Sequence, residues 1–305
     1  MQDFSRPRKE VSMGILVQQL FNGLALGLVY ALVAVGYSMV FGILRLINFS
    51  HGAVYAFGAH VAFFFVGIHF GPVPAIIMAV IITGCLGVLI DKLALLPLRK
   101  KRSIPIAALV TTIGISNIIQ NLLVIRFGSQ RKPFPDFFNL GAFTLRGIQL
   151  SSRQFVMLGV SLALLLILLA VVHRTKIGLA MRATSQNVKA AVLMGINVNN
   201  VITLTFLMGG ASAAIAGGMV SGYYQVVYPG MGFMIGLKAF AASVLGGIGN
   251  LTGALMGGLL VGVIESVAAL YIGSNYRDSM AFIILIVVLI FRPAGLLGTK
   301  EIIKV

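Results

Sequence analysis

The chain carries FVMLGVSLALLLILLAVV at residues 155–172 and VITLTFLMGGASAAIAGGMV at 201–220, with the polar stretch RTKIGLAMRATSQNVKAAVLMGINV at 174–198 between them. Each apolar run has nearly the length of about 20 residues that a helix needs to cross the hydrocarbon core of a bilayer. The three stretches therefore predict two membrane-spanning helices joined by a polar segment that lies outside the bilayer.

The polar stretch 174–198 is longer and more regular than most loops between spans. Small and apolar residues recur in it at intervals of four, three and four positions, at Thr184, Val188, Ala191 and Gly195. This spacing predicts one helical face, with Arg182 and Lys189 elsewhere on the helix. Two interpretations follow: a small-faced helix that docks into a groove of a soluble partner, or an amphipathic helix that lies on lipid.

The composition excludes a soluble protein. Of the 305 residues, 59% are hydrophobic and 10% are charged, whereas about a quarter of the residues in soluble domains are charged. The net charge of +16 would suggest nucleic acid in a soluble protein. Here the basic residues cluster between apolar runs, as in LRKKR at 98–102, a pattern typical of cytoplasmic loops beside anionic lipid. We therefore expect an all-α polytopic integral membrane protein that contacts membrane lipid and no nucleic acid.

The apolar runs leave room for about eight transmembrane helices in a single domain over 1–305. A polar tail, 1–13, precedes the first of them and has no clear cleavage site of a signal peptide behind it. The tail lies outside if 14–69 holds two passes and inside if it holds three, and the charge pattern leaves both open. The expected spans lie near 14–44, 48–69, 73–96, 105–126, 154–172, 200–221, 237–271 and 279–298.

Two of the apolar segments are interrupted. The polar sequence RLINFSHG occupies 45–52, and the glycine-rich sequence GGIGNLTG occupies 246–253. Unwound backbone at membrane depth is tolerated only where protein or a water-filled cavity covers it. Broken helices in the two halves of a chain are a pointer to a transport pathway near the midplane. The alternative is an ordinary loop in the first segment and a run of packing glycines in the second.

The sequence has no motif for nucleotide hydrolysis, since the chain lacks the Gly-Lys dipeptide of a phosphate-binding loop. His51, His60 and His69 are spaced nine residues apart and rotate to different helix faces, so no metal site is expected. Cys85 is the only cysteine, which excludes a disulfide within the chain. Glu265 is the one acid deep in an apolar run, either as a proton site or as a carboxylate bonded to a neighbouring hydroxyl or cation.

Three segments together match a known family. They are FNGLALGLVYALVAVGYSMVFGILRLINFSHG at 21–52, MRATSQNVKAAVLMGINV at 181–198 and KAFAASVLGGIGNLTGALMGGLLVGVIES at 238–266. The combination closely resembles the permease subunits of ABC importers for branched-chain amino acids, and in particular the shorter, Liv H-type permease. The resemblance runs nearly end to end. A neighbouring branch of the family imports urea and short amides.

The resemblance implies that 174–199 is a cytoplasmic coupling loop that contacts an ATPase subunit. Gln186 and Asn187 depart from the family pattern, because acidic residues often occur at these two positions. The expected coupling residues are Arg182, Thr184, Gln186, Val188, Ala190, Ala191 and Gly195. The expected residues of the substrate pathway match the family motifs N-F-[AS]-H-G and G-G-I-G, and they are Asn48, Ser50, His51, Gly52, Gly246, Gly247 and Gly249.

The resemblance also implies the partners and the location. The partners would be a second homologous permease, two cytoplasmic ATPase subunits that bind ATP and Mg, and an extracytoplasmic solute-binding protein. The chain itself would bind no cofactor and no metal, have no catalytic residue, and lie in the cytoplasmic (inner) membrane of a bacterium as a multi-pass protein.

The expected function is import of branched-chain, hydrophobic amino acids, driven by ATP hydrolysis on the partner subunits. Alternatives are a permease for urea or short amides, a secondary transporter driven by protons through Glu265, and a passive channel. The polar stretch 174–198 argues against the last two, because neither a secondary transporter nor a channel needs a docking helix.

Overall fold

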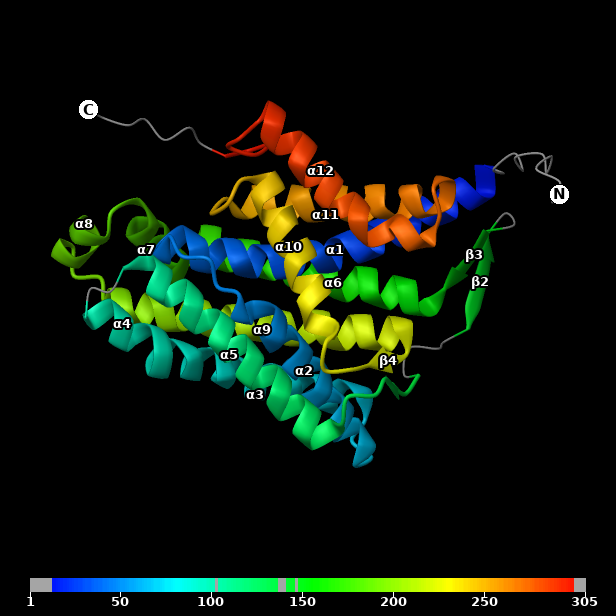
Figure 1. Ribbon diagram of the computed structural model, residues 1–305, viewed down its shortest axis with the longest axis horizontal. Helices are drawn as coiled ribbons and strands as arrows, with labels where there is room; N and C mark the ends of the chain where they lie inside the picture. The colour runs from blue at the N-terminus through cyan, green and yellow to red at the C-terminus, as the bar shows by residue number, and fades with distance from the viewer. Residues whose placement is uncertain (1–12, 102–103, 137–140, 146–147, 299–305) are drawn as a thin grey trace, which may run out of the picture.

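Helices make up most of the computed structural model, which describes residues 13–101, 104–136, 141–145 and 148–298 (Figure 1). Of the predicted polar tail 1–13, residues 1–12 lie outside this part of the chain, and Met13 begins the first helix. The helices are α1 (Met13–Leu44), α2 (Ser50–Gly67), α3 (Pro72–Ile90), α4 (Leu96–Lys100), α5 (Pro105–Phe127), α6 (Ser152–Arg174), α7 (Lys176–Gln186), α8 (Val188–Leu193), α9 (Val198–Tyr224), α10 (Met231–Gly246), α11 (Leu251–Tyr271) and α12 (Arg277–Phe291).

Two short helical turns and four short strands complete the described elements. A π-helical turn, Asp91–Leu95, joins α3 to α4, and a 3-10 turn, Ser274–Tyr276, precedes α12. The strands form two antiparallel pairs, β1 with β4 and β2 with β3. They are β1 (Lys132–Pro133), β2 (Ala142–Leu145), β3 (Ile148–Ser151) and β4 (Val226–Val227).

Seven helical segments in the described part of the chain are long and apolar enough to cross a membrane. This confirms the prediction of an all-α polytopic membrane protein. They are Gly14–Leu44, Pro72–Lys100, Ile106–Phe127, Ser152–Arg174, Val198–Tyr224, Leu251–Tyr271 and Ser274–Phe291.

The interruption predicted near 246–253 is confirmed, but 237–271 is not a single span, because the chain reverses at this break. The segment is divided between α10, a shorter apolar helix, and α11. Gly247 and Gly249, between them, have φ values of +106° and +87°, which glycine adopts without the steric cost that other residues meet. The Asn250 side chain then accepts a hydrogen bond from the Gly253 amide and caps α11.

The core of the bundle forms where α1 packs against α11. Cβ atoms added at Gly258 or Gly262 would collide with the backbone of Ala31 or Gly27. Glycines therefore let the two helix backbones approach closely, as small residues do between helices in lipid. The close approach fixes the position of α11, and of the polar side chains that it carries, relative to α1.

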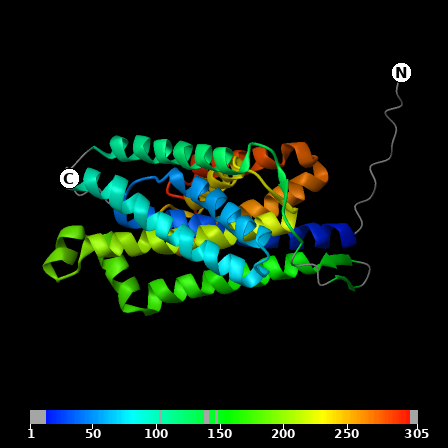
Figure 2. The ribbon, with the colours of Figure 1, turned by 90° about the horizontal axis from the view of Figure 1, so that it is seen from below.

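The bundle has two distinct ends, which both views show (Figure 1, Figure 2). The helices α7 and α8 lie at one end, which we call the α7–α8 end. The strands β2 and β3 and the first turn of α1 lie at the opposite end, which we call the strand end. The first helix thus runs from the strand end towards the α7–α8 end.

Candidate functional site

The polar segment between α6 and α9 folds into two short helices and not one. The Thr175 hydroxyl accepts a hydrogen bond from the Gly178 amide and caps α7, and the Asn187 side chain accepts one from the Ala190 amide and caps α8. Asn187 has an extended backbone, which ends α7 and begins α8. Gly195 lies beyond α8 with φ of +82°. The predicted single helix with one small face over 184–195 is therefore wrong, because a side chain that caps the second helix interrupts the first.

The residues of the predicted face point to different surroundings. Thr184 and Ala191 are buried against the bundle, whereas Val188 and Gly195 are exposed. The exposed apolar side chains gather on α8 and just after it, where Leu193 is 87% exposed. We call this group the α8 tip, and it consists of Val188, Val192, Leu193 and Met194.

The other expected coupling residues divide into exposed and inward-facing ones. Gln186 and Ala190 are exposed. Arg182 donates a hydrogen bond from its guanidinium to the carbonyl of Val172 and so ties α7 to the end of α6. Leu193 and Met194 were missed by sequence reasoning, and the signal was a pair of large apolar residues next to Gly195 in an otherwise polar loop.

The first predicted break, 45–52, contains the first residues of α2, which begins inside the bundle. Asn48, Ser50 and His51 are buried, and the Asn48 side chain accepts hydrogen bonds of 3.1 and 2.6 Å from the backbone amide and the hydroxyl of Ser50. The His51 ring packs edge-on against Tyr37, with 4.8 Å between the ring centroids. A Cβ atom added at Gly52 would collide with the carbonyl of Gly232 on α10. These residues hold α2 against α1 and α10.

A cavity of about 260 Å³ opens between α2, α5 and α10. Of the residues predicted from the first break, Gly52 lines it. Asn117 and Gln120 of α5 also line it, and sequence reasoning missed both, although amide side chains within an apolar span were a visible signal. Aromatic and aliphatic side chains complete the wall, so the cavity is amphipathic: Tyr37, Phe49, Ile113, Phe233 and Leu237.

The second predicted break joins a larger cavity, of about 370 Å³, near α7. Gly249 lines this cavity together with Arg182 and Gln186 of α7. The structure thus brings one expected pathway residue and two expected coupling residues to one place. Gly246 and Gly247 face protein instead, because a Cβ atom at either position would meet the backbone of Gly253 or Gly298.

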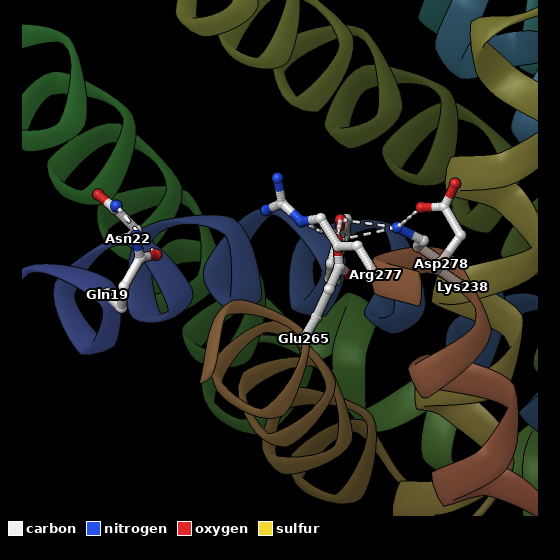
Figure 3. A network of polar contacts seen from close by, with 7 residues as sticks. Gln19, Asn22, Lys238, Glu265, Arg277 and Asp278 are labelled. Carbon is white, nitrogen blue, oxygen red and sulfur yellow. Dashed lines mark hydrogen bonds and ion pairs between the residues drawn. The ribbon is translucent and has the colours of Figure 1, made fainter. Parts of the chain in front are cut away.

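A network of four charged residues lies where α10, α11 and α12 meet (Figure 3). The Glu265 carboxylate, 1% exposed, lies 2.9 Å from the Lys238 ammonium and 2.6 Å from Nε of Arg277. The same ammonium lies 2.6 Å from the carboxylate of Asp278. The hydroxyl of Tyr30 on α1 donates to the Glu265 carboxylate over 3.2 Å. The interpretation that Glu265 bonds to a neighbouring hydroxyl and cation is confirmed, and the cost of burying its charge is offset by these partners.

No metal site was found in the part of the chain that the structure describes, where no group of three or more His, Cys, Asp or Glu residues could hold an ion. Cys85 is a free and exposed cysteine on α3.

Comparison with known proteins then decides the family. Residues 19–289 match the family described as branched-chain amino acid transport system / permease component. The chain belongs to this family. It is 41% identical to the high-affinity branched-chain amino acid transport system permease protein BraD of Pseudomonas aeruginosa, over 95% of this chain and 98% of BraD. It is also 38% identical to the corresponding permease LivH of Escherichia coli K12, over 95% of this chain and 97% of that protein.

A more distant relative carries a similar description. The chain is 31% identical to the probable branched-chain amino acid transport permease protein LivH of Methanocaldococcus jannaschii, over 88% of both chains. Membership confirms the resemblance drawn from the sequence motifs. The chain is thus a multi-pass membrane protein of a permease family, and the individual pathway and coupling residues stay predictions.

Proposed function

We propose that the chain is the transmembrane permease subunit of an ABC importer for branched-chain, hydrophobic amino acids. The observation that carries this proposal is the relationship, over nearly the full length, to BraD and LivH, which are named as permeases of branched-chain amino acid transport systems. ATP and Mg bind to partner ATPase subunits, which hydrolyse the ATP, and this chain binds no cofactor.

The α8 tip is the surface that we assign to an ATPase subunit. Large apolar side chains that gather at the end of a loop are a common sign of a protein contact. Gln186 and Ala190 lie exposed beside them. Movement of the ATPase would reach the spans through α7, because Arg182 bonds to the end of α6. Rigid-body movement of this kind is a frequent way to couple two sites.

This assignment orients the chain in the membrane. With the α7–α8 end on the cytoplasmic side, the strand end is extracytoplasmic and the first turn of α1 lies there. A solute-binding protein would then deliver substrate at the strand end. The location that follows is the cytoplasmic membrane of a bacterium, with a single permease domain over 1–305.

The second permease would pack against α5, because this membrane-length helix exposes polar side chains on the outside of the bundle. Asn117 and Asn121 are exposed on this membrane-length helix. Amide side chains are costly against lipid and are expected to face protein or water. The neighbouring cavity between α2, α5 and α10 supplies polar and apolar groups, as a path for an amino acid requires. The breaks at 45–52 and 246–253 would border the path on this permease.

The test is uptake by the complete complex of both permeases, the ATPases and the binding protein, reconstituted in proteoliposomes. We expect uptake of labelled leucine that requires ATP on the ATPase side and the binding protein on the other. Labelled urea should not accumulate, and ADP in place of ATP is the control. Urea uptake without leucine uptake would favour the amide branch of the family. Leucine uptake by this chain alone, driven by a proton gradient, would overturn the ABC assignment.

A further inference from the structure

A third cavity, of about 270 Å³, lies beside the charged network. All four charged residues of the network line it, and with Arg131 the cavity is bordered by three cations and two anions. Arg131 also lines it, with its guanidinium 5.0 Å from the centroid of the Tyr228 ring. The volume is just below the about 300 Å³ at which pockets for drug-sized ligands begin. It therefore suits a ligand of the size of one amino acid. The other lining residues are Tyr30, Val220, Tyr224, Val226, Met231, Met234 and Ile235.

The charges of this cavity limit what it can hold. Lys238 and Arg277 offset Glu265 and Asp278 within the network, and Arg131 adds one positive charge to the wall. A lone cation would add to this positive charge in a poorly solvated site, which is costly, and a lone anion would leave the carboxylates of the wall without a new partner. A zwitterion adds one charge of each sign and can exchange partners with the network without changing the balance.

Three side chains of the network have capacity for such a ligand. Nε of Arg277 faces Glu265, while the two terminal nitrogens of its guanidinium point away from that carboxylate (Figure 3). These nitrogens have the fork geometry that binds a carboxylate through two hydrogen bonds. Asp278 is 57% exposed and offers a carboxylate to an ammonium group. Within the described residues, Oε2 of Glu265 is buried without a hydrogen-bond partner.

The wall contributed by α10 is apolar. Met234 and Ile235 line the cavity one helical turn before Lys238, and Met231 lines it two turns before. Methionine is flexible and polarizable, and it adapts to side chains of different shape. An aliphatic side chain of several shapes could therefore be covered here, next to the groups that would bind its amino and carboxyl ends.

We propose that this cavity binds the α-amino acid zwitterion, with the ligand carboxylate at Arg277, the ammonium at Asp278 and the aliphatic side chain against Met231, Met234 and Ile235. The proposal rests on the proposed import function and names a substrate station within the permease itself. The cavity lies at the end of α9 that adjoins β4, away from α7 and α8 (Figure 1). It thus lies in the half of the bundle into which a binding protein would release substrate.

A cysteine-protection experiment tests this in the full complex. Cys85 is the single cysteine of the chain, so a Cys85→Ser background allows one new cysteine to be labelled with a maleimide. Met234→Cys places the probe in the cavity. Ile68→Cys is the control, because this residue is exposed at the end of α2 and lines neither this cavity nor the one between α2, α5 and α10. Labelling of this chain is followed with nucleotide and binding protein absent and with leucine at millimolar concentrations.

Leucine should slow the labelling of Met234→Cys and leave that of Ile68→Cys unchanged. For one site the slowing is the factor 1 + [L]/Kd, about threefold when leucine is at twice its Kd. Isocaproate lacks the ammonium and isoamylamine lacks the carboxylate, so neither should protect, and neither should urea. Protection should be lost when Arg277→Gln or Asp278→Asn is added.

Equal protection at both positions, or none at either, would overturn the proposal. Protection by isocaproate as strong as that by leucine would also overturn it, because the site would then not recognise the ammonium group. If Met234→Cys does not assemble, Ile235→Cys supplies the probe at a second lining position. ATP-driven leucine uptake measured in parallel separates the two proposals: uptake without protection at Met234→Cys rejects the substrate station and leaves the proposed import function standing.

Discussion

The α8 tip and the charged network have opposite relations to their surroundings. At the α7–α8 end, Leu193 and Met194 are 87% and 82% exposed although they are apolar. Towards the strand end, Glu265 and Lys238 are 1% and 4% exposed although they are charged. The buried charges are paired with one another, so the fold itself accounts for them. The exposed apolar residues have no such partner in the described chain, and they form the surface that we propose an ATPase subunit covers. The comparison contrasts buried charges that the fold pairs with apolar residues that it leaves exposed.

The largest effect should follow from removing the central carboxylate of the network. Glu265→Gln leaves Lys238 and Arg277 with only the half-exposed Asp278. We expect a loss of about 3 kcal/mol or more of stability, because breaking a buried ion pair leaves an uncompensated charge. Thermal unfolding of the purified complex in detergent measures it. The double variant Lys238→Met with Glu265→Gln removes one charge of each sign and should recover part of the loss. Unchanged stability of the single variant would show that the buried network contributes no more to the stability of the fold than the exposed α8 tip does.

A change at the α8 tip should weaken assembly and leave folding unchanged. Leu193→Ser should reduce the affinity for the ATPase subunit by about 2 kcal/mol, or about 30-fold, as expected for a central apolar contact. Its effect on stability should stay within about 0.5 kcal/mol, since the side chain is exposed. Binding of the purified ATPase to permease-containing nanodiscs measures the first quantity. Leu193→Met keeps an apolar side chain and is the control. Full ATPase affinity of Leu193→Ser would remove the tip from the interface.

The cap of α8 should have a smaller and local effect. Asn187→Ala removes the side chain that accepts from the Ala190 amide, which costs about 1 kcal/mol for a typical helix cap. Hydrogen exchange of the α8 amides should become about fivefold faster. Asn187→Asp keeps the capping oxygen and restores an acidic residue, so its exchange should match that of the unmodified chain. Equal exchange in all three proteins would show that the tip holds α8 without its cap.

The smallest effect is expected at the exposed edge of the network. Asp278→Asn removes the ion pair with Lys238, but the Asp278 side chain is 57% exposed. Ion pairs of this kind contribute about 0–1 kcal/mol. Thermal unfolding should therefore place Asp278→Asn near the unmodified chain and far from Glu265→Gln. A loss equal to that of Glu265→Gln would mean that the whole network, and not only its buried part, stabilises the fold.

Much of the fold could be predicted because the membrane restricts the choices. A chain with 59% hydrophobic and 10% charged residues has to satisfy its backbone within helices, so apolar runs such as 155–172 can be identified directly. The polar stretch 174–198 and the two interrupted segments were likewise visible, because they depart from that pattern. The family followed from motifs that lie in these same segments.

The direction that the chain takes after each break, and the residues that each side chain contacts, could not be predicted in this way. Which residues of 174–199 share one helix face depended on Asn187. This residue can lie within a continuous helix, or its side chain can cap the start of the next helix. The reversal of the chain between α10 and α11 depended on positive φ values at Gly247 and Gly249, which the sequence permits and does not require. The expectation that Glu265 has a cation or hydroxyl beside it was available, but the identity of the partners was not.

The sequence by itself determined that this chain is a helical membrane protein with a polar segment between two spans and one acid, Glu265, deep in an apolar run. These properties depend on residues within about one turn or one span of each other. Only the tertiary structure decided which charges meet. The Tyr30 hydroxyl reaches Glu265 across 235 positions of sequence, and this contact exists because glycines let α1 and α11 approach closely. Helix packing sets such long-range contacts, and no local pattern encodes the side from which a partner will come.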